Sequence, residues 1–356
     1  MPEYWFRYGN VEIPVEIDEE VRVEKISIDP IVKYDYTAIS KLTDQLTDSR
    51  DIAILYEYAS NRDLDLLRTF IAELEARGFE KDKIKVLASS WRIDWKTLEE
   101  ELEEILKPYR KSLVFSWNED KVEFRNMMIS RSILEASSRV VITSMIPHGV
   151  IGFPSIKENL LLSKWIMFKD ENSDLWSILK EELKFLGLVI GGDTLFYGDL
   201  GKIEEECKDR AEKTHTVKID EAAEILLVDA GGRPWDSTLE SSLHLIRLVS
   251  DGVVEGGLIG LIGECGRGLG STEFIEALFS QEISRDALSG KILKIVKEVV
   301  DVKKLALVTT IPRSILGKTL NAKGFDSPQD LLTYGFRMYS KQASVKIVNG
   351  LGWLTR

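Results

Sequence analysis

The stretch that decides the fold of this chain runs from residue 225 to residue 274. It opens with ILLVDAGGRPWDS (225–237), continues through a helical pattern and a second apolar strand, and closes with GECGRGLGSTEF (263–274). Both strands end in small, polar or charged residues. Ligands of open α/β sheets bind beyond the carboxyl ends of the strands, so we expect residues 229–236 and 264–272 to face the same crevice.

The two loops that follow these strands favour an anionic ligand. Gly231 and Gly232 allow close approach of a backbone. Ser271 and Thr272 can cap a helix that begins near Glu273, and the first N–H groups of a helix attract a carboxylate or a phosphate. The alternative is that both loops are ordinary tight turns between strands and helices.

Composition sets the class of protein. The chain has 356 residues, of which 44% are hydrophobic, so we expect two domains. A formal net charge of −12 opposes binding to nucleic acid. No apolar run approaches the roughly 20 residues of a membrane span, and the first residues do not resemble a signal peptide, so we expect a cytoplasmic protein without membrane contact. Cys207 and Cys265 are too few for a disulfide framework or a thiolate metal cage.

Strands and helices alternate along the first half of the chain. Residues 51–59 predict a buried strand, residues 63–78 an amphipathic helix and residues 83–90 the next strand, which is a βαβ unit. The alternation continues through a helix predicted over 124–138 to a strand at 139–146. It predicts an α/β protein with mainly parallel sheets and helices on both faces.

Two segments predict antiparallel hairpins, and the domain boundary follows them. Residues 4–17 alternate in polarity, and residues 188–199 turn at Gly191 and Gly192. We expect an N-terminal α/β domain over 1–205 and a C-terminal α/β domain over 206–356, joined by a hinge in the region of 195–220. A ligand cleft is expected between the two domains.

The chain has only three histidines, and two of them lie where ligands bind. His148 follows the strand at 139–146, and His244 lies on the helix after GGRPWD, three residues beyond Ser241. Either histidine can instead be a hydrogen-bonding residue without chemistry, and the apolar neighbours of His244 fit a partly buried helix position. His215 is expected in a surface connection.

Three ordered motifs resemble the lactate racemase family that carries a nickel-pincer nucleotide. They are IPHGVIGFPSIK (146–157), VDAGGRPWDSTLESSLH (228–244) and GECGRGLGSTEF (263–274). The resemblance covers most of the chain, from about Asp51 onward. It implies that His148 is a catalytic histidine and that Lys157 holds the cofactor covalently. The cofactor-binding residues that it implies are Lys157, Gly231, Gly232, Asp236, Gly266, Gly268, Gly270 and Ser271.

The chain departs from the family pattern at several site positions. In YEYASNRD (56–63) Arg62 is kept as a candidate to bind a substrate carboxylate, whereas the threonine before it is replaced by asparagine. In SSWR (89–92) Trp91 stands where a second catalytic histidine is expected, with Arg92 beside it. Ser241 and His244 stand where the family tends to have glutamine and lysine. Because no histidine occurs between His148 and His215, no later nickel-binding histidine is expected.

The resemblance implies an isomerase that racemises or epimerises a small 2-hydroxy acid by cofactor-mediated hydride transfer. Such a reaction needs a base for the hydroxyl, a hydride acceptor and a cationic clamp for the carboxylate. We expect His148, Lys157 and His244 to carry the chemistry, with His148 and His244 as a pair assembled from the two domains. Arg62, Trp91, Arg92 and Ser241 are the predicted substrate-binding residues. The alternative is a non-catalytic relative that binds a nucleotide or an organic acid in the same cleft.

Overall fold

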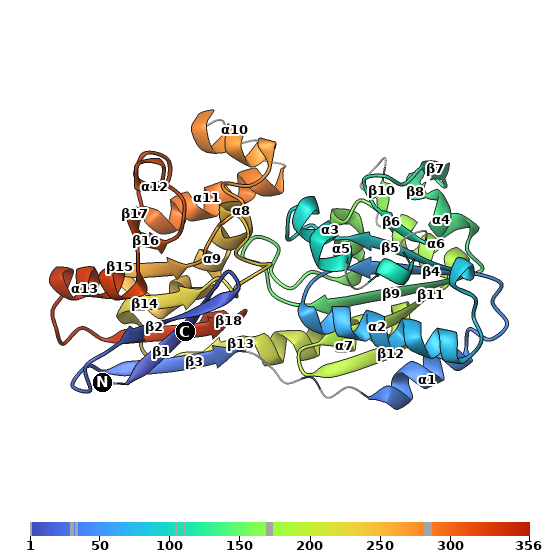
Figure 1. Cartoon of the computed structure of the whole chain (residues 1–356), viewed down its shortest axis with the longest axis horizontal. Coiled ribbons are helices and arrows are strands. Elements are labelled where there is room, and N and C mark those ends of the chain that lie inside the picture. Colours follow the sequence, from blue (N-terminus) through green and yellow to red (C-terminus); the bar gives the residue numbers. More distant parts are fainter. Residues whose placement is uncertain are drawn as a thin grey trace. The chain divides into compact units, whose positions relative to one another are not determined.

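The computed structural model divides the chain into two compact units (Figure 1). The structure describes residues 2–28, 32, 35–103, 106–109, 112–168, 174–280 and 287–356. Unit 1 comprises Met1–Asp29, Pro147–Gly152 and His215–Arg356, and unit 2 comprises Pro30–Ile146 and Phe153–Thr214. This division differs from two continuous domains with a boundary at 205, because the first strands and the segment that carries His148 belong with the C-terminal part of the chain.

Unit 2 is built on a six-stranded sheet with the strand order β12-β11-β9-β4-β5-β6. Its strands are parallel except for β12, which forms the expected hairpin with β11 at the edge. Every residue of β4 is buried, as the continuous apolar run predicts. The bounds are β4 Ile52–Glu57, β5 Ile84–Ser89, β6 Leu113–Phe115, β9 Ser138–Met145, β11 Phe185–Gly191 and β12 Thr194–Asp199.

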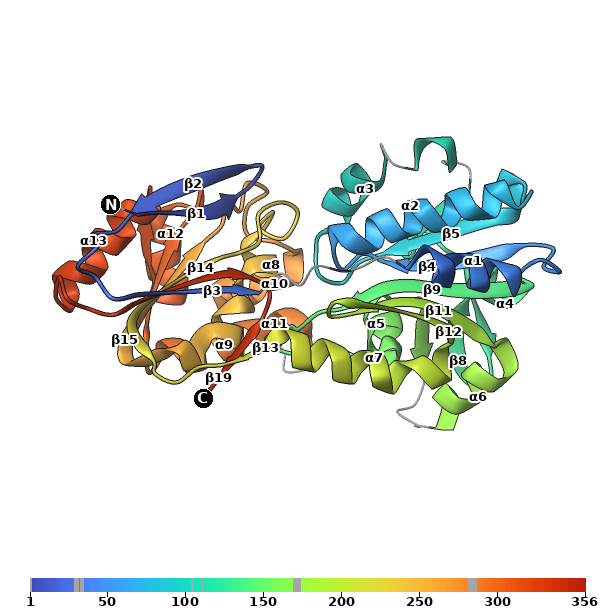
Figure 2. The same ribbon diagram turned by 90° about the horizontal axis from the view of Figure 1, so that it is seen from below.

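Helices cover both faces of this sheet. Figure 2 shows α2 on one side and α5 and α7 on the other, where Leu160 and Cys207 belong to the same buried cluster as Leu55 of the sheet. The helices are α1 Tyr36–Asp44, α2 Asn61–Ala76, α3 Trp95–Glu103, α4 Arg131–Glu135, α5 Ile156–Leu162, α6 Asp174–Leu183 and α7 Leu200–His215, with 3-10 turns at Lys81–Lys83 and Lys107–Tyr109.

The helix predicted over 124–138 is wrong for most of its length. The segment forms a hairpin between β7 (Lys121–Phe124) and β8 (Met127–Ser130), followed by the short helix α4. Arg125 and Asn126 both adopt positive φ angles, of 49° and 65°, which make the tight turn that joins two antiparallel strands. Strand β10 (Ile166–Phe168) completes this small sheet beside β8.

Unit 1 is built on a second six-stranded sheet, with the order β17-β16-β15-β14-β18-β3 and parallel pairing throughout. The edge strand β3 comes from the start of the chain and pairs with β18 near its end. The bounds are β3 Val23–Ile28, β14 Ala223–Asp229, β15 Val253–Ile262, β16 Lys304–Val308, β17 Lys323–Phe325 and β18 Val345–Gly350. The predicted α/β class with mainly parallel sheets is confirmed.

The predicted N-terminal hairpin is confirmed as β1 (Glu3–Tyr8) and β2 (Val11–Glu16). Phe6, Val15 and Ile17 are buried with Leu227 and Ile262 of the main sheet, so the hairpin and α13 form one of its two cores. The other elements of unit 1 are α8 Leu239–Leu243, α9 Leu245–Val249, α10 Thr272–Ser280, α11 Leu288–Val300, α12 Arg313–Leu320, α13 Pro328–Met338, β13 Thr216–Lys218, β19 Trp353–Thr355 and a 3-10 turn at Ser250–Gly252.

Among the described helices, none combines the length and apolar character that a membrane span requires.

Candidate functional site

Each of the two main sheets has a place where consecutive chain segments leave in opposite directions along the sheet. In unit 1 this is between β14 and β18, and in unit 2 it is between β4 and β9. Ligands of open α/β sheets bind at such places, outside the carboxyl ends of the strands. We therefore describe the side chains at these two edges in turn.

In unit 1 the edge between β14 and β18 is closed by the chain's own arginine. Asp229 ends β14 with a fully buried side chain, and Arg7 of the hairpin donates to its Oδ1 at 3.0 Å. Asn349 of β18 donates from Nδ2 to Oδ2 of the same carboxylate at 2.9 Å. The position that a ligand would take in this sheet thus holds an internal ion pair.

The GGRPWD loop is tied to the turn of the same hairpin. The N–H of Gly9 donates to Asp236 Oδ2 at 2.6 Å, and the N–H of Arg233 donates to the carbonyl of Gly9 at 2.9 Å. A Cβ on Gly232 would lie 3.0 Å from the Cβ of Arg7. The close approach that Gly232 allows is therefore taken by the hairpin, which sequence patterns did not reveal, whereas a Cβ on Gly231 would lie 3.1 Å from the Trp235 ring of the same loop.

The second glycine loop is closed by hydrogen bonds within unit 1. Asp236 Oδ2 accepts from the N–H of Glu264 at 2.9 Å, and the carbonyls of Gly268 and Leu269 accept from the N–H groups of Leu239 and Glu240. The two predicted loops therefore lie together at one sheet edge, as expected. Gly266 contributes to the same turn, with a neighbouring glutamate carboxyl 3.1 Å from its would-be Cβ.

Ser271 caps helix α10, as predicted, but the anion at this helix start belongs to the protein. The Ser271 hydroxyl accepts from the N–H of Phe274 at 3.1 Å. The N–H of Ser271 donates to Glu240 Oε2 at 2.8 Å, and Ser289 donates to Glu240 Oε1 at 2.5 Å. Gly270 makes room for this carboxylate, because a Cβ there would lie 2.6 Å from Glu240 Cβ.

His148 and His244 lie against one another within unit 1. Their ring centroids are 3.9 Å apart with an angle of 24° between the planes, and both side chains are buried. His244 is the single residue between α8 and α9, and His148 begins a tight turn whose N–H and carbonyl exchange hydrogen bonds of 2.8 Å with Gly152. The structure brings together the two histidines that the sequence marks as catalytic.

Backbone N–H groups of this turn donate to both imidazoles. The N–H of Val150 donates to His148 Nδ1 at 3.2 Å, and the N–H of Gly149 donates to His244 Nδ1 at 3.3 Å. Gly149 has no room for a side chain, because a Cβ would lie 2.1 Å from the carbonyl oxygen of His244. The turn and the α8–α9 junction therefore fix both rings.

Ser241 and His215 take places other than those expected. Ser241 is the third residue of α8 and forms a capping box with Thr238, to whose carbonyl its hydroxyl donates at 2.8 Å. The Ser241 hydroxyl thus takes part in capping the start of α8. His215 is buried rather than a surface residue, and its Nδ1 lies 2.8 Å from the carbonyl oxygen of Leu351.

In unit 2 the edge between β4 and β9 holds a buried ion pair that the sequence analysis missed. Glu57 is the last residue of β4, and its Oε1 lies 4.0 Å from Nε of Arg92. Thr143 of β9 donates to Glu57 Oε2 at 2.6 Å, and Arg92 donates to the carbonyl of Ile146 at 3.1 Å. A charged residue that ends an otherwise apolar strand is the signal that marks Glu57.

Burial dominates the electrostatics of this pair. It raises the pKa of Glu57 to about 6, although Arg92 and the Thr143 hydroxyl act in the opposite direction. It lowers the pKa of Arg92 to about 10, against the effect of Glu57. Glu57 Oε1 and Arg92 Nε each have no hydrogen-bond partner among the described residues, so the pair is held by charge at 4.0 Å rather than by a direct hydrogen bond.

Trp91 and Arg92 form one packed group with helix α5. The guanidinium of Arg92 lies 4.1 Å from the centroid of the Trp91 ring, and Trp91 donates from Nε1 to Asn159 Oδ1 at 3.0 Å. Lys157 is in the first turn of α5, half-buried, with its Nζ 5.7 Å from the Phe168 ring centroid. Trp91 is therefore held as a structural partner of Arg92.

Arg62 is the second residue of α2, at the carboxyl edge of the unit 2 sheet. Ser60 caps this helix and lies 3.2 Å, hydroxyl to hydroxyl, from Ser144 of β9. The Arg62 side chain is half-buried. Its predicted role as a carboxylate clamp stays a prediction.

The side chains of the described residues fit a cofactor linked covalently to a lysine better than they fit a nickel ion coordinated by the protein. Lys157 is a half-buried residue, and its primary amine is a chemical group suited to a covalent link. No group of three or more histidine, cysteine, aspartate or glutamate residues suited to a metal occurs in the described part of the chain. Burial raises the pKa of Cys265 to about 11 and also raises the pKa of Cys207, so both thiols favour the protonated form.

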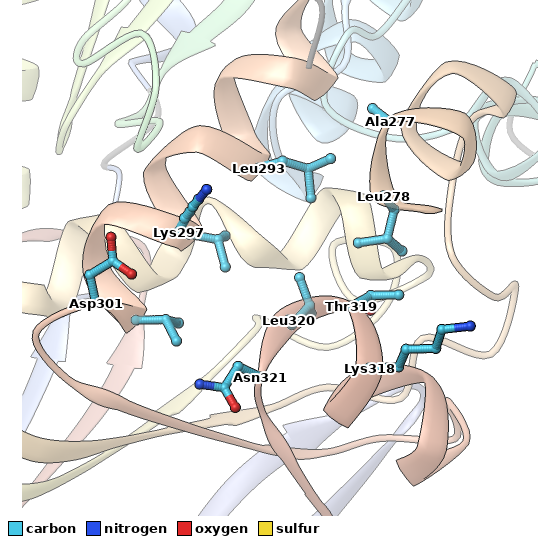
Figure 3. A pocket seen from close by; sticks show the side chains of 11 residues that line it. Ala277, Leu278, Leu293, Lys297, Asp301, Lys318, Thr319, Leu320 and Asn321 are labelled. Carbon is cyan, nitrogen blue, oxygen red and sulfur yellow. The ribbon is translucent and has the colours of Figure 1, made fainter. Parts of the chain in front are cut away.

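A separate pocket of about 340 Å³ lies among α10, α11 and α12 of unit 1. Figure 3 shows Leu278, Leu293 and Leu320 pointing toward its centre, with Lys297 and Asn321 among the polar side chains around them. None of the predicted site residues lines it. This pocket is therefore separate from the predicted site residues.

Comparisons with known proteins give a fold but no family. No protein-family model matches the chain, and no curated protein matches it. Among solved structures, the lactate racemase apoprotein from Thermoanaerobacterium thermosaccharolyticum superposes with a TM-score of 0.69 over 100% of both chains, at 15% sequence identity. A structural genomics target from Thermotoga maritima gives a TM-score of 0.57 over 90% of this chain and 97% of that one, at 14% identity. The chain therefore has a fold similar to that of a lactate racemase apoprotein.

Proposed function

We propose that this protein is an isomerase that racemises or epimerises a 2-hydroxy acid by cofactor-mediated hydride transfer. The observation that carries the proposal is the contact between His148 and His244, whose rings stack 3.9 Å apart. These two histidines are 96 positions apart in the chain, and both are fixed by the same turn. The fold shared with a lactate racemase apoprotein supports the same class of reaction.

The chain's own residues bind and orient the substrate under this proposal. A nickel-pincer nucleotide held through Lys157 supplies the hydride acceptor when it is bound, since no side chain accepts hydride. His148 and His244 act on the hydroxyl oxygen of the substrate, which loses its proton in this reaction. Arg62 binds the substrate carboxylate in a charge-assisted pair. Arg92, which Glu57 and the Trp91 ring hold in place, keeps a second cation at the same sheet edge as Arg62.

A second candidate function is binding of an organic acid or a nucleotide without catalysis. The observation that favours it is the position of Trp91, where an imidazole is expected by resemblance, and its indole N–H is engaged with Asn159. With tryptophan at position 91, either His244 is the second proton donor to the substrate or the site has no second donor. Arg62 binds the carboxylate in both candidate functions. The two are therefore distinguished by catalytic activity on 2-hydroxy acids and by loading of the cofactor on Lys157.

The test is to express the full chain in cells that make the nickel-pincer nucleotide and to incubate it with single enantiomers of lactate and larger 2-hydroxy acids. Chiral chromatography measures interconversion, and intact mass and nickel content measure loading on Lys157. The proposal expects an added mass and turnover that His148→Ala lowers by about 100-fold. His215→Gln is the matched control, since it removes a histidine outside the pair.

A bare-chain mass together with no interconversion of any 2-hydroxy acid rejects the isomerase. Titration calorimetry with lactate then tests the binding candidate, in which Arg62→Ala weakens affinity and His148→Ala has little effect. Thermal unfolding of each variant shows whether a loss comes from the site or from the fold.

A further inference from the structure

We infer that the pocket of about 340 Å³ among α10, α11 and α12 binds a small amphiphilic carboxylate, with an unbranched apolar chain on its floor and the carboxylate at its rim (Figure 3). All of its lining residues belong to unit 1, and none of them takes part in the proposed isomerase reaction. The inference therefore adds a second ligand site and does not depend on the proposed function.

The floor of this pocket is apolar and belongs to the core of unit 1. Leu278, Leu293, Val296 and Leu320 line it, and each is only 2–7% exposed. All four are members of one buried cluster, whose close packing forms the floor before any ligand arrives. The volume is near the lower end of the range of about 300–1,000 Å³ that small-molecule sites occupy, so a small ligand fits best.

The α11 wall of this pocket follows from the spacing of its residues. Val296, Lys297 and Val300 are three, four and seven positions beyond Leu293, so the four share one face of the helix. The apolar stem of a lysine can cover apolar surface while its amine stays at the edge. The wall is therefore apolar along most of its length and cationic at one position, which is the pattern that an amphiphilic anion requires.

The rim of this pocket has an excess of positive charge. Lys297 and Lys318 line it, and Asp301 is the only acidic side chain among the lining residues. Within the described ranges, neither lysine amine has a hydrogen-bond or ion-pair partner. Two ammonium groups against one carboxylate leave one positive charge in excess, in a protein whose formal net charge is −12. A ligand with a single negative charge complements this rim.

The polar groups at the rim also favour a ligand that accepts hydrogen bonds. Asn321 ends α12 in a left-handed conformation, with φ 52°, and its carboxamide carries two N–H donors. The hydroxyl of Thr319 already donates to the carbonyl of Ile315 at 2.8 Å. Lys297, Lys318 and Asn321 therefore offer donors at the rim, and an ionised carboxylate is an acceptor at both oxygens.

The two lysines also have a structural role that the test must separate from binding. Lys297 is in the last turn of α11 and Lys318 in the last turn of α12, where a cation stabilises the end of a helix. That role alone predicts a small loss of stability on substitution and no bound ligand. Binding and unfolding are therefore both measured for each variant.

The test is titration calorimetry of the full chain with hexanoate, octanoate and decanoate near neutral pH. Burial of each added methylene should raise the affinity about fourfold until the floor is filled. Octanol has the same chain as octanoate with a neutral head and should bind about tenfold more weakly, because it lacks the charge-assisted contact. No binding of decanoate, no dependence on chain length, or equal affinity for octanol and octanoate overturns the inference.

Charge variants test the rim. Lys297→Gln combined with Lys318→Gln should weaken octanoate binding about tenfold and leave octanol binding unchanged. Lys294→Gln is the matched control, because Lys294 is an exposed lysine of α11 that pairs with Glu298 and does not line the pocket. Asp301→Asn should strengthen octanoate binding about threefold, since it removes a like charge. Unchanged octanoate affinity in the double lysine variant overturns the assignment of an anionic ligand.

A blocking variant tests whether the ligand occupies this pocket. Ala277 is a half-buried residue of α10 that lines it, so the indole of Ala277→Trp should fill the space and abolish octanoate binding. Ile275→Trp is the control, because Ile275 is exposed on the same helix and does not line the pocket. Thermal unfolding shows that each variant is folded, and octanoate binding retained by folded Ala277→Trp overturns the inference. Should Ala277→Trp not fold, the charge variants, at exposed positions, decide the question alone.

Discussion

Arg7 and Asp229 form an ion pair of 3.0 Å although they are 222 positions apart in the chain. Their contact fastens the N-terminal hairpin over the carboxyl edge of the unit 1 sheet, at the place where ligands bind in related architectures. The glycine loops beside it meet the hairpin and one another. The part of the sequence with the strongest ligand-binding pattern is thus largely occupied by the protein itself.

Arg7→Ala should lower the free energy of unfolding of unit 1 by about 3 kcal/mol, because it leaves a buried carboxylate without its cation. Asn349 and the N–H of Gly231 still donate to Asp229, so the loss falls at the lower end for a broken buried pair. Denaturant unfolding followed by fluorescence measures it. The matched control is Arg22→Ala, whose ion pair with Glu221 is exposed and whose loss should cost less than about 1 kcal/mol.

Gly9→Ala should cost about 1–2 kcal/mol and Gly78→Ala about 1 kcal/mol, although both glycines have positive φ. A Cβ on Gly9 would lie 2.2 Å from Glu264 Oε2, whereas one on Gly78 would meet nothing within 4 Å. The difference between the two unfolding free energies therefore separates the effect of the contact with Glu264 from the effect of backbone strain. Equal costs for the two variants would show that the hairpin turn does not press on the second glycine loop.

The stability of unit 2 should fall as the pH rises from about 4.5 to about 6, because burial raises the pKa of Glu57 from 4.5 to about 6. The folded state holds this proton more tightly than the unfolded state, so the contribution is fully present below the unfolded pKa and is lost above the folded one. The change is on the order of 2 kcal/mol.

Glu57→Gln should remove this pH dependence, since the amide does not titrate. The measurement is the unfolding free energy of wild type and variant across that pH window, compared at each pH. Parallel curves for the two proteins would mean that Glu57 titrates normally in the folded state.

Glu240→Ala should destabilise unit 1 by about 1–2 kcal/mol, because the N–H of Ser271 and the hydroxyl of Ser289 both lose their acceptor. The exposed Glu276, on α10 itself, is the control, and its replacement by alanine should change little. Addition of phosphate tests whether the N–H of Ser271, which has lost Glu240 as its acceptor, then attracts an anion. Stabilisation by phosphate in Glu240→Ala and not in wild type would confirm that Glu240 fills an anion position.

Sequence patterns predicted the fold where local periodicity determines it. The apolar runs that became β4 and β14 and the alternation that became β1 and β2 are set by neighbours in the chain. The helix predicted over 124–138 failed because Arg125 and Asn126 both adopt left-handed conformations, which asparagine favours but arginine does not. The place of β3 beside β18 depends on a contact between distant segments and left no local signal.

The candidate site was predictable only in part, for the same reason. The pairing of His148 with His244 was expected, and the structure contains it, although both belong to unit 1 and not to separate domains. Glu57 carried a readable signal, since a carboxylate ends an apolar strand. Arg7 and Glu240 did not, because their roles depend on where a hairpin and a helix start lie in space.

The pairing of β3 with β18 has a consequence for folding during synthesis on the ribosome. Val23 pairs with Val345, so the first strand of the sheet waits while about 320 further residues are made, which takes about 16–64 s at about 5–20 residues per second. Ile26 and Ile28, both buried in the finished protein, stay without their strand partners Val348 and Gly350 for that time. Unit 2, whose residues all emerge by Thr214, can fold first, and the early hairpin and strand are then the segment that a nascent-chain chaperone must cover.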